Sequence, residues 1–187
     1  NALGPDNAQR QAAMANAPVA GPWIAEQCLR ENLTEGGIGA AIYASADDCV
    51  LTEDEAGMLV RSLLSAGVDT TVTAVGSALW SFAKAPEQFA VLRDDPQGRA
   101  LAAFEETIRY PSPVNAFCRT TNVDTEVAGV SIAAGTKILC VLGAANLDDA
   151  HWLEADRFDI SRRTIGHLGL GAGVHTCVGQ NIARAEG

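Results

Sequence analysis

The sequence has few basic residues. Lys and Arg together number 13 against 23 Asp and Glu, so the 187-residue chain carries a formal net charge of -10. This balance repels the phosphate backbone of nucleic acids and anionic lipid surfaces. Neither nucleic acid nor a membrane surface is therefore an expected partner.

Long apolar runs and a disulfide framework are also missing. Arg61 and Asp69 interrupt the best apolar stretch, which leaves it short of the ~20 residues that cross a bilayer. The five cysteines form an odd set without a CxxC pair, namely Cys28, Cys49, Cys118, Cys140 and Cys177. Free thiols are typical of a reducing compartment, so we expect a cytoplasmic protein without a membrane span.

The composition is that of a globular protein, with 48% hydrophobic and 19% charged residues. The chain begins with Asn1 rather than Met, and Glu186 and Gly187 end it within a helical pattern. We therefore expect a piece of a longer protein.

The first fifty residues give weak signals. Residues 1–20 are rich in Ala, Asn, Pro and Gly, which predicts a loop or a frayed segment. A helical pattern follows through residues 23–29 until Gly36 and Gly37 break it. The apolar stretch 38–43 fits a helix and a strand equally well.

A long helix is predicted from residue 52. Thr52 and Glu55 have the spacing of a capping box, and no proline interrupts the apolar pattern before Pro86. At 1.5 Å per residue such a helix extends roughly 50 Å, whereas a compact globule of this size measures roughly 40 Å across. A helix of this length indicates that the chain belongs to a larger domain.

Short helices are expected next, at residues 86–94 and 98–108, because prolines precede or stop each of them. β-Branched runs separated by Gly129 and Gly135 then predict a small sheet. An irregular stretch follows to residue 165, and such stretches are usually functional. The sequence thus predicts a mainly α fold with a small β-sheet.

The most informative segment leads up to Cys177. Three glycines at 169, 171 and 173 permit unusual backbone dihedrals, and the cysteine comes just before a helix, where a thiolate is favoured. A soft metal is the natural partner of such a sulfur. Three other readings remain open, namely a phosphate-binding loop, a zinc site shared with His175, and a cysteine that only fills the core.

The segment Gly169-Leu-Gly-Ala-Gly-Val-His-Thr-Cys-Val-Gly179 resembles the haem-binding loop of the cytochrome P450 superfamily. The resemblance implies that Cys177 is the fifth ligand of the iron of haem b and that its thiolate favours O–O cleavage. It also implies that His175 meets a haem propionate and that Leu170, Gly171 and Gly179 line the cofactor. The family has Phe where this chain has Leu170, a change that affects the tuning of the iron potential more than the ligation.

Two more segments resemble the same family. Ala66-Gly-Val-Asp-Thr-Thr71 matches its oxygen-activation motif, which implies that Thr70 holds water beside dioxygen, that Asp69 relays protons, and that Ala66 faces the haem. Alternatively, the threonines bond back to the i-4 carbonyls. Glu106-Thr-Ile-Arg109 matches the Glu-x-x-Arg signature, with Arg157 as its third member; taken alone, it is only an i, i+3 pair. Arg119 resembles a propionate-binding arginine of the family.

Helical spacing predicts one wall of a substrate cavity above the haem. Ser62 and Ser65 share a helix face with Asp69 and Thr70, so their side chains are expected to face this cavity. Val114 and Phe117 are expected to enter it from the sheet. This wall would suit a flat aromatic substrate. Alternatively, the two serines only cap i-4 carbonyls.

The resemblance implies a fragment of one domain with a partial P450 fold. We expect the haem-thiolate enzyme to insert one atom of dioxygen into a small organic substrate, with residues 59–71 and 112–117 most similar to enzymes of para-substituted benzoates. Electrons would come from NAD(P)H through a ferredoxin reductase and a ferredoxin. An inert haem-protein fragment and a peroxide-using enzyme are the alternatives.

The expected parts of the domain are helices (1–50), the oxygen-activation helix (52–84), short helices (86–113), the sheet (114–142), the meander (143–165) and the Cys loop with the start of the last helix (166–187).

Overall fold

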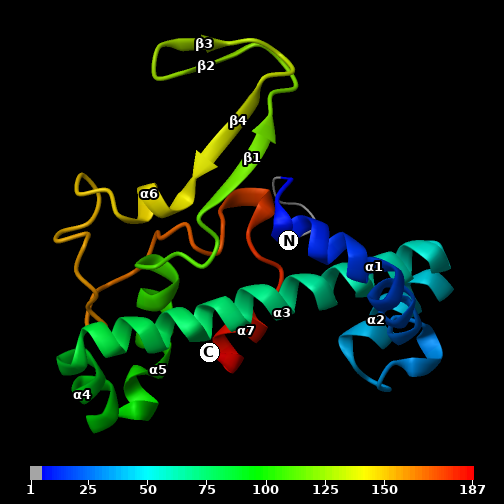
Figure 1. Ribbon diagram of the computed structural model, residues 1–187, viewed down its shortest axis with the longest axis horizontal. Helices are drawn as coiled ribbons and strands as arrows, with labels where there is room; N and C mark the ends of the chain where they lie inside the picture. Colours follow the sequence, from blue (N-terminus) through cyan, green and yellow to red (C-terminus); the bar gives the residue numbers. More distant parts are fainter. Residues whose placement is uncertain (1–5) are drawn as a thin grey trace. The chain divides into compact units, whose positions relative to one another are not determined.

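The structure is a computed structural model that describes residues 6–187. These residues are mainly helical with small antiparallel sheets, which confirms the predicted fold class (Figure 1). The chain divides into two compact units, Asn1–Ala66 and Gly67–Gly187, and the boundary falls inside one long helix. The helices are α1 (Ala8–Gln27), α2 (Ile38–Asp47), α3 (Glu53–Lys84), α4 (Pro86–Asp94), α5 (Pro96–Arg109), α6 (Leu142–Asn146) and α7 (Gln180–Glu186). Two short 3-10 turns are η1 (Arg30–Asn32) and η2 (Gly173–His175).

The predicted loop over residues 1–20 is wrong from Ala8 onward. The side chain of Asn7 accepts a hydrogen bond from the Arg10 amide at 3.0 Å and caps α1, and an alanine-rich sequence favours the helix. Pro18 and Pro22 lie within this helix, although proline usually interrupts one. The prediction for residues 1–5 lies outside the described residues.

Residues 38–43, which fitted either a helix or a strand, begin α2. In the core of the first unit, Tyr43 packs with Cys28, Ala56 and Val60. The Tyr43 hydroxyl donates to the Cys28 carbonyl at 2.9 Å, so α2 is tied to the end of α1. This tertiary contact explains why sequence periodicity alone did not decide the element.

The long helix begins where the capping box predicts. The Thr52 amide and hydroxyl donate to Glu55 Oε2 at 2.8 and 2.9 Å, and the Glu55 amide donates back to Thr52 Oγ1 at 3.2 Å. These bonds lower the pKa of Glu55. The 32 residues of α3 include an 18-residue window with a mean hydropathy of 1.2, enough by length and composition for a membrane span. The core helix of a soluble protein meets the same requirement.

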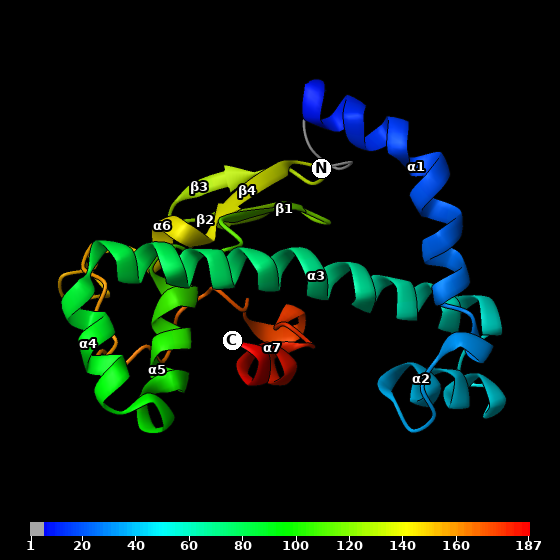
Figure 2. The ribbon, with the colours of Figure 1, turned by 60° about the horizontal axis from the view of Figure 1, so that its bottom comes forward.

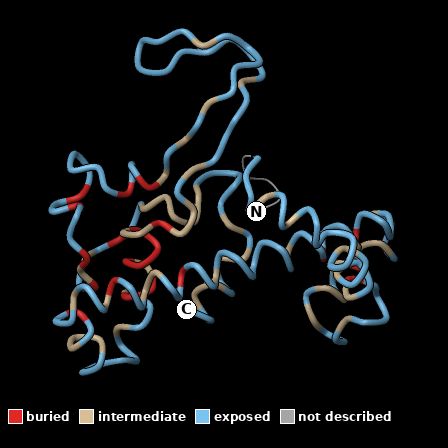
Figure 3. Tube along the Cα trace, in the orientation of Figure 1, coloured by how far each residue is buried: buried red, intermediate tan, exposed pale blue. Residues whose placement is uncertain are grey.

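The core of the second unit lies around α5. One cluster joins Ala74 of α3 to Phe104 and Ile108 of α5, with Leu170 and Ala183 packed against it. A second cluster is built on Ala103, Phe158 and Ile160. In Figure 3 the buried positions gather on α5 and on the segments beside it, whereas the strands are mostly exposed. The helix with the Glu-x-x-Arg motif is therefore the centre of this unit.

The strands form two ladders instead of the single small sheet that was predicted. β1 (Ala116–Thr120) pairs antiparallel with β4 (Lys137–Val141), and β2 (Thr125–Val127) pairs antiparallel with β3 (Val130–Ile132). The second ladder is an excursion between β1 and β4, and Figure 1 shows it beyond the end of their ribbon. In Figure 2 both ladders lie on the same side of α3. Neither β2 nor β3 pairs with β1 or β4, so the two ladders are separate sheets.

Candidate functional site

The segment before Cys177 folds into a series of tight turns. Gly171 and Gly173 adopt positive φ angles of 74° and 64°, which only glycine adopts without strain. The Cys177 amide donates to the Leu170 carbonyl at 2.8 Å and closes the loop. The Cys177 thiol is free and partly exposed, just ahead of α7. The loop thus presents one sulfur on a backbone that its own hydrogen bonds hold.

Gly169 brings this loop into direct contact with α5. A Cβ at this position would lie 2.3 Å from Ile108 Cγ2 and 2.5 Å from the Ile108 carbonyl oxygen. At Gly179, by contrast, a Cβ would touch only Cys177 Sγ, at 3.9 Å. Gly169 is therefore needed for close packing against Ile108, whereas the unusual dihedrals expected of the three glycines are found at Gly171 and Gly173.

The other residues predicted around the cysteine differ in exposure. Leu170 is half-buried and packs against the cluster of Ala74, Phe104 and Ile108. His175 is exposed in η2. The neighbouring apolar side chains of Val174 and Val178 are 97% and 84% exposed. The surface next to Cys177 along the chain is thus apolar and uncovered.

Glu106 and Arg109 form the pair that the sequence motif predicts. Arg109 Nε donates to Glu106 Oε2 at 2.7 Å and Nη2 donates to Oε1 at 2.8 Å, with both side chains fully buried. The guanidinium also donates to three backbone carbonyls, those of Asn146 at 2.7 Å, Ala155 at 2.9 Å and Arg157 at 3.1 Å. The pair therefore fastens the irregular stretch 147–165 to α5.

The side chain of Arg157, the third member of the predicted triad, does not take part in the buried network. The side chain of Arg157 is 55% exposed and pairs with Glu154 at 3.1 Å, so only its backbone carbonyl enters the network. Arg162 instead approaches Glu106, with Nε 3.4 Å from Oε1 and a side chain only 11% exposed. The Asp159 amide donates to the same oxygen at 2.9 Å. The chain turns after Arg157, which points the later arginine inward.

The predicted oxygen-activation residues lie on α3. Asp69 and Thr70 are exposed in the second unit, and the Asp69 carbonyl accepts a hydrogen bond from the Thr73 hydroxyl at 2.8 Å. In the first unit the Ser62 hydroxyl donates to the Met58 carbonyl at 2.8 Å, the alternative use considered for that serine. Ser65 and Ala66 are exposed.

The predicted propionate arginine lies on β1. Arg119 is exposed, and its guanidinium carbon lies 5.5 Å from the ring centroid of Phe117, two residues earlier on the same strand face. Its Nη1 donates to the Cys118 carbonyl at 3.0 Å. Val114 is partly buried just before the strand. A cation and an aromatic ring thus share one face of β1.

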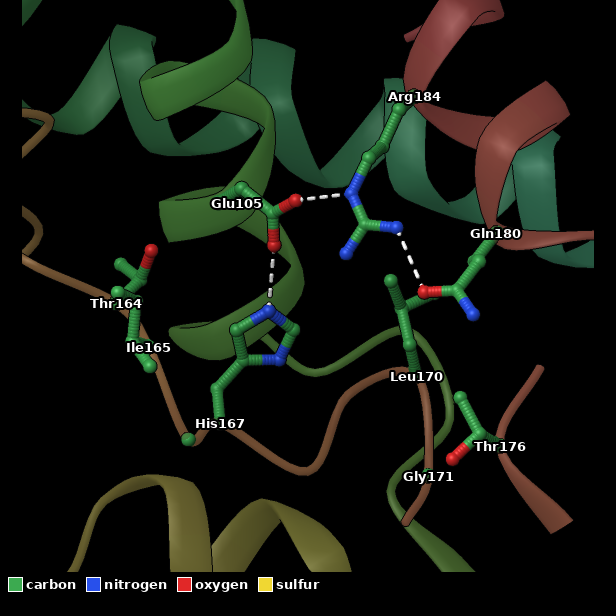
Figure 4. A pocket seen from close by; sticks show the side chains of 10 residues that line it. Glu105, Thr164, Ile165, His167, Leu170, Gly171, Thr176, Gln180 and Arg184 are labelled. Carbon is green, nitrogen blue, oxygen red and sulfur yellow. Dashed lines mark hydrogen bonds and ion pairs between the residues drawn. The ribbon is translucent and has the colours of Figure 1, made fainter. Parts of the chain in front are cut away.

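A cluster beside the Cys loop was not predicted from the sequence. Glu105 accepts hydrogen bonds from His167, at 2.6 Å, and from Arg184 (Figure 4). These residues line a cleft of about 360 Å³ together with Leu170, Gly171 and Thr176. The bond with His167 is the main reason why the pKa of Glu105 is lowered, and Arg184 adds to it against the effect of burial. The only signal in the sequence was the second acid next to Glu106.

Residues 100–187 match the family model for cytochrome P450. The whole chain is 51% identical over 187 residues to cytochrome P450 CYP199A2 of Rhodopseudomonas palustris, of which it covers 45%. The chain belongs to the cytochrome P450 family.

Solved P450 structures agree with this assignment. The haem domain of the Tepidiphilus thermophilus P450 matches all of the chain at 30% identity with a TM-score of 0.87, and 46% of that domain is covered. Cytochrome P450 CREJ in complex with (4-ethylphenyl) dihydrogen phosphate matches 87% of the chain at 30% identity with a TM-score of 0.78, and 42% of it is covered. The chain thus spans less than half the length of each relative.

The residues around Cys177 fit the haem-thiolate chemistry of this family. The iron of a haem takes four ligands from the porphyrin, so a single free thiol suffices as the protein's contribution. Cys177 is such a thiol, and exposed apolar side chains flank it, as a flat apolar macrocycle requires. His175 and Arg119 supply exposed donors of the kind that carboxylate groups bind.

Proposed function

We propose that this chain carries the haem-thiolate part of a bacterial monooxygenase that inserts one atom of dioxygen into a small organic substrate. The observation that carries the proposal is the free Cys177 thiol at the end of a closed glycine loop that packs on the Glu-x-x-Arg helix. When bound, haem supplies the oxygen chemistry, and the protein supplies ligation, orientation and protons. The whole enzyme's activity is part of the proposal because the chain spans 45% of CYP199A2.

The chain's own residues have separate roles in this proposal. Cys177 ligates the iron, His175 and Arg119 bind the propionates, and Leu170 with Gly171, Gly179 and Ala66 lines the cofactor. Thr70 holds a water molecule and Asp69 exchanges protons with it, since both are polar groups exposed on one segment of α3. Ser65, Val114 and Phe117 remain candidates for substrate contact, whereas the Ser62 hydroxyl already bonds to the Met58 carbonyl.

The proposal for the substrate is a para-substituted aromatic acid such as a benzoate. It rests on the resemblance of residues 59–71 and 112–117 and on the similarity to CREJ, whose structure holds a para-substituted phenyl phosphate. We also propose a cytoplasmic enzyme that takes electrons from NAD(P)H through a ferredoxin reductase and a ferredoxin. Turnover with these two proteins, compared with turnover on peroxide, distinguishes this route from a peroxide-using enzyme of the same fold.

We further propose that the chain forms the C-terminal portion of one P450 domain. Many apolar side chains of α3 are exposed in the described structure, among them Val68 at 55%, Val72 at 67% and Leu79 at 69%. An uncovered apolar surface of this kind favours association or aggregation in water. We therefore expect the 187 residues alone to bind haem poorly, and stoichiometric haem uptake by a stable monomer of this chain would contradict that expectation.

The ligand assignment is tested in the protein that carries this chain. Cys177→Ala should abolish the absorption band that ferrous, carbon monoxide-bound haem shows when a thiolate ligates it. Cys118→Ala is the matched control, because that free cysteine lies exposed on β1. If the band survives in Cys177→Ala, another residue is the ligand and the proposed function fails at its centre.

A further inference from the structure

One carboxylate contacts both flanks of the Cys177 loop. Glu105 lies on α5, whereas His167 comes ten residues before the cysteine and Arg184 seven residues after it. Figure 4 shows the carboxylate between the imidazole and the guanidinium, each facing a different oxygen. The two ends of the loop are therefore fixed to one point on α5.

In the first contact, the hydrogen bonds define the tautomer of the His167 imidazole. The Gly169 amide donates to His167 Nδ1 at 3.1 Å, so this nitrogen is an acceptor and Nε2 carries the proton that points at Glu105 Oε2, 2.6 Å away. The imidazole thereby connects α5 to the backbone at the start of the glycine loop. Its side chain is 7% exposed and that of Glu105 is 15% exposed, so water screens the bond weakly.

The second contact holds the helix that follows the cysteine. Arg184 Nε donates to Glu105 Oε1, and Nη1 donates to Gln180 Oε1 at 2.8 Å. Both Gln180 and Arg184 belong to α7, whose first amide donates to the Cys177 carbonyl at 3.3 Å. Fixing Arg184 therefore limits the movement of the backbone immediately after the sulfur.

We propose that Glu105 is a positioning residue for the Cys177 thiolate, acting through His167 on one flank of the loop and Arg184 on the other. This inference rests on the proposed function, in which Cys177 ligates haem. It differs from the role of Glu106, whose carboxylate binds Arg109, the Asp159 amide and Arg162 in the described part of the chain and thereby holds the stretch 147–165. Adjacent acids on one helix thus hold different segments.

The test compares Glu105→Gln with Glu154→Gln. Both substitutions keep the side-chain shape and remove the charge from an ion pair with arginine, but the Glu154 carboxylate pairs with Arg157 in an exposed position, whereas the Glu105 carboxylate binds the two flanks of the Cys loop. In the haem-free form of the protein that carries this chain, hydrogen exchange of the peptides that contain Gly171 and Cys177 should speed up by about tenfold in Glu105→Gln, as expected for the loss of charge-assisted bonds. Alkylation of Cys177, resolved by mass spectrometry, should accelerate similarly. Glu154→Gln should match the unsubstituted chain in both measurements.

Two one-sided variants separate positioning from general destabilisation. His167→Gln should increase exchange before the cysteine, and Arg184→Gln should increase it mainly in α7. In the haem-loaded protein, Glu105→Gln should divide the carbon monoxide-bound haem between the thiolate band and the band of protonated thiol. Glu105→Asp should partly restore the thiolate band.

The outcomes keep this inference apart from the ligand assignment. Unchanged exchange, alkylation and spectrum in Glu105→Gln would overturn the positioning role while Cys177 remains the ligand. Equal increases in exchange over the whole chain would overturn it as well, because they would indicate a general loss of stability. A thiolate band that survives in Cys177→Ala would refute the ligand assignment, and exchange in the haem-free form of the same protein would still report on the two flanks.

Discussion

Arg109 and Glu106, one turn apart on α5, form a two-fold hydrogen-bonded ion pair from which solvent is fully excluded. The Glu106 carboxylate also accepts a hydrogen bond from the Asp159 amide, and the Arg109 guanidinium also donates hydrogen bonds to three backbone carbonyls of distant segments. A buried pair of this kind adds little net stability by itself, because desolvation offsets the attraction. Its effect is architectural, since it sets where the segment between α6 and the Cys loop meets α5.

The first prediction concerns the third arginine of this network. Arg162→Gln should lower the free energy of unfolding by about 2 kcal/mol, because it breaks hydrogen bonds to Glu106 and to the carbonyls of Glu154 and Arg157. Arg157→Gln should change it by less than about 0.5 kcal/mol, since that side chain is more than half exposed. Urea unfolding of the two variants measures the difference. A larger loss in Arg157→Gln would restore the triad that the sequence motif predicts.

The second prediction concerns the close packing of the Cys loop on α5. Gly169→Ala should destabilise the protein by at least about 2 kcal/mol, because its Cβ would overlap the side chain and carbonyl of Ile108. Gly76→Ala is the matched control on α3, where a Cβ meets nothing within 4 Å and alanine favours the helix by up to about 1 kcal/mol. Thermal unfolding should show a lower midpoint for Gly169→Ala and an equal or higher one for Gly76→Ala.

The third prediction is a dependence on pH. The folded state lowers the pKa of Glu105 below its ordinary value of 4.5, so its contribution to stability is complete above that value. As the pH falls toward the lowered pKa, the carboxylate takes up a proton and this contribution is lost. The stability difference between the unsubstituted chain and Glu105→Gln should therefore be constant above the ordinary value and shrink below it.

Urea titrations across this range measure that difference. Repeating them in a His167→Gln background removes any contribution from the imidazole. A difference that grows as the pH falls would show that Glu105 is not stabilised as a carboxylate.

The fourth prediction concerns proton delivery in the protein that carries this chain. Thr70→Ala should leave substrate binding nearly unchanged, while NAD(P)H consumption continues without a matching amount of product and peroxide is released. Thr73→Ala is the control, because its hydroxyl donates to the Asp69 carbonyl within the helix. If the amount of product still matches NAD(P)H consumption in Thr70→Ala, Thr70 has no role in proton delivery.

The sequence alone determined the elements whose signals are local. Thr52 and Glu55 fix the start of α3 through bonds within one turn, and Pro86 fixes the start of α4. The pair of Glu106 with Arg109 needs only helical spacing, and the order of motifs around Cys177 was enough to indicate the family. The two helix starts and the ion pair each depend on residues a few positions apart.

Tertiary structure decided what depends on residues far apart in the chain. Ile38–Tyr43 became a helix because Tyr43 packs on Cys28, and Arg162 replaced Arg157 beside Glu106 because the chain turns between them. Glu105 joined His167 and Arg184 only when α5 lay against the Cys loop. Helical periodicity cannot show such pairs, because their separation of 62 and 79 residues is closed by packing and not by local geometry.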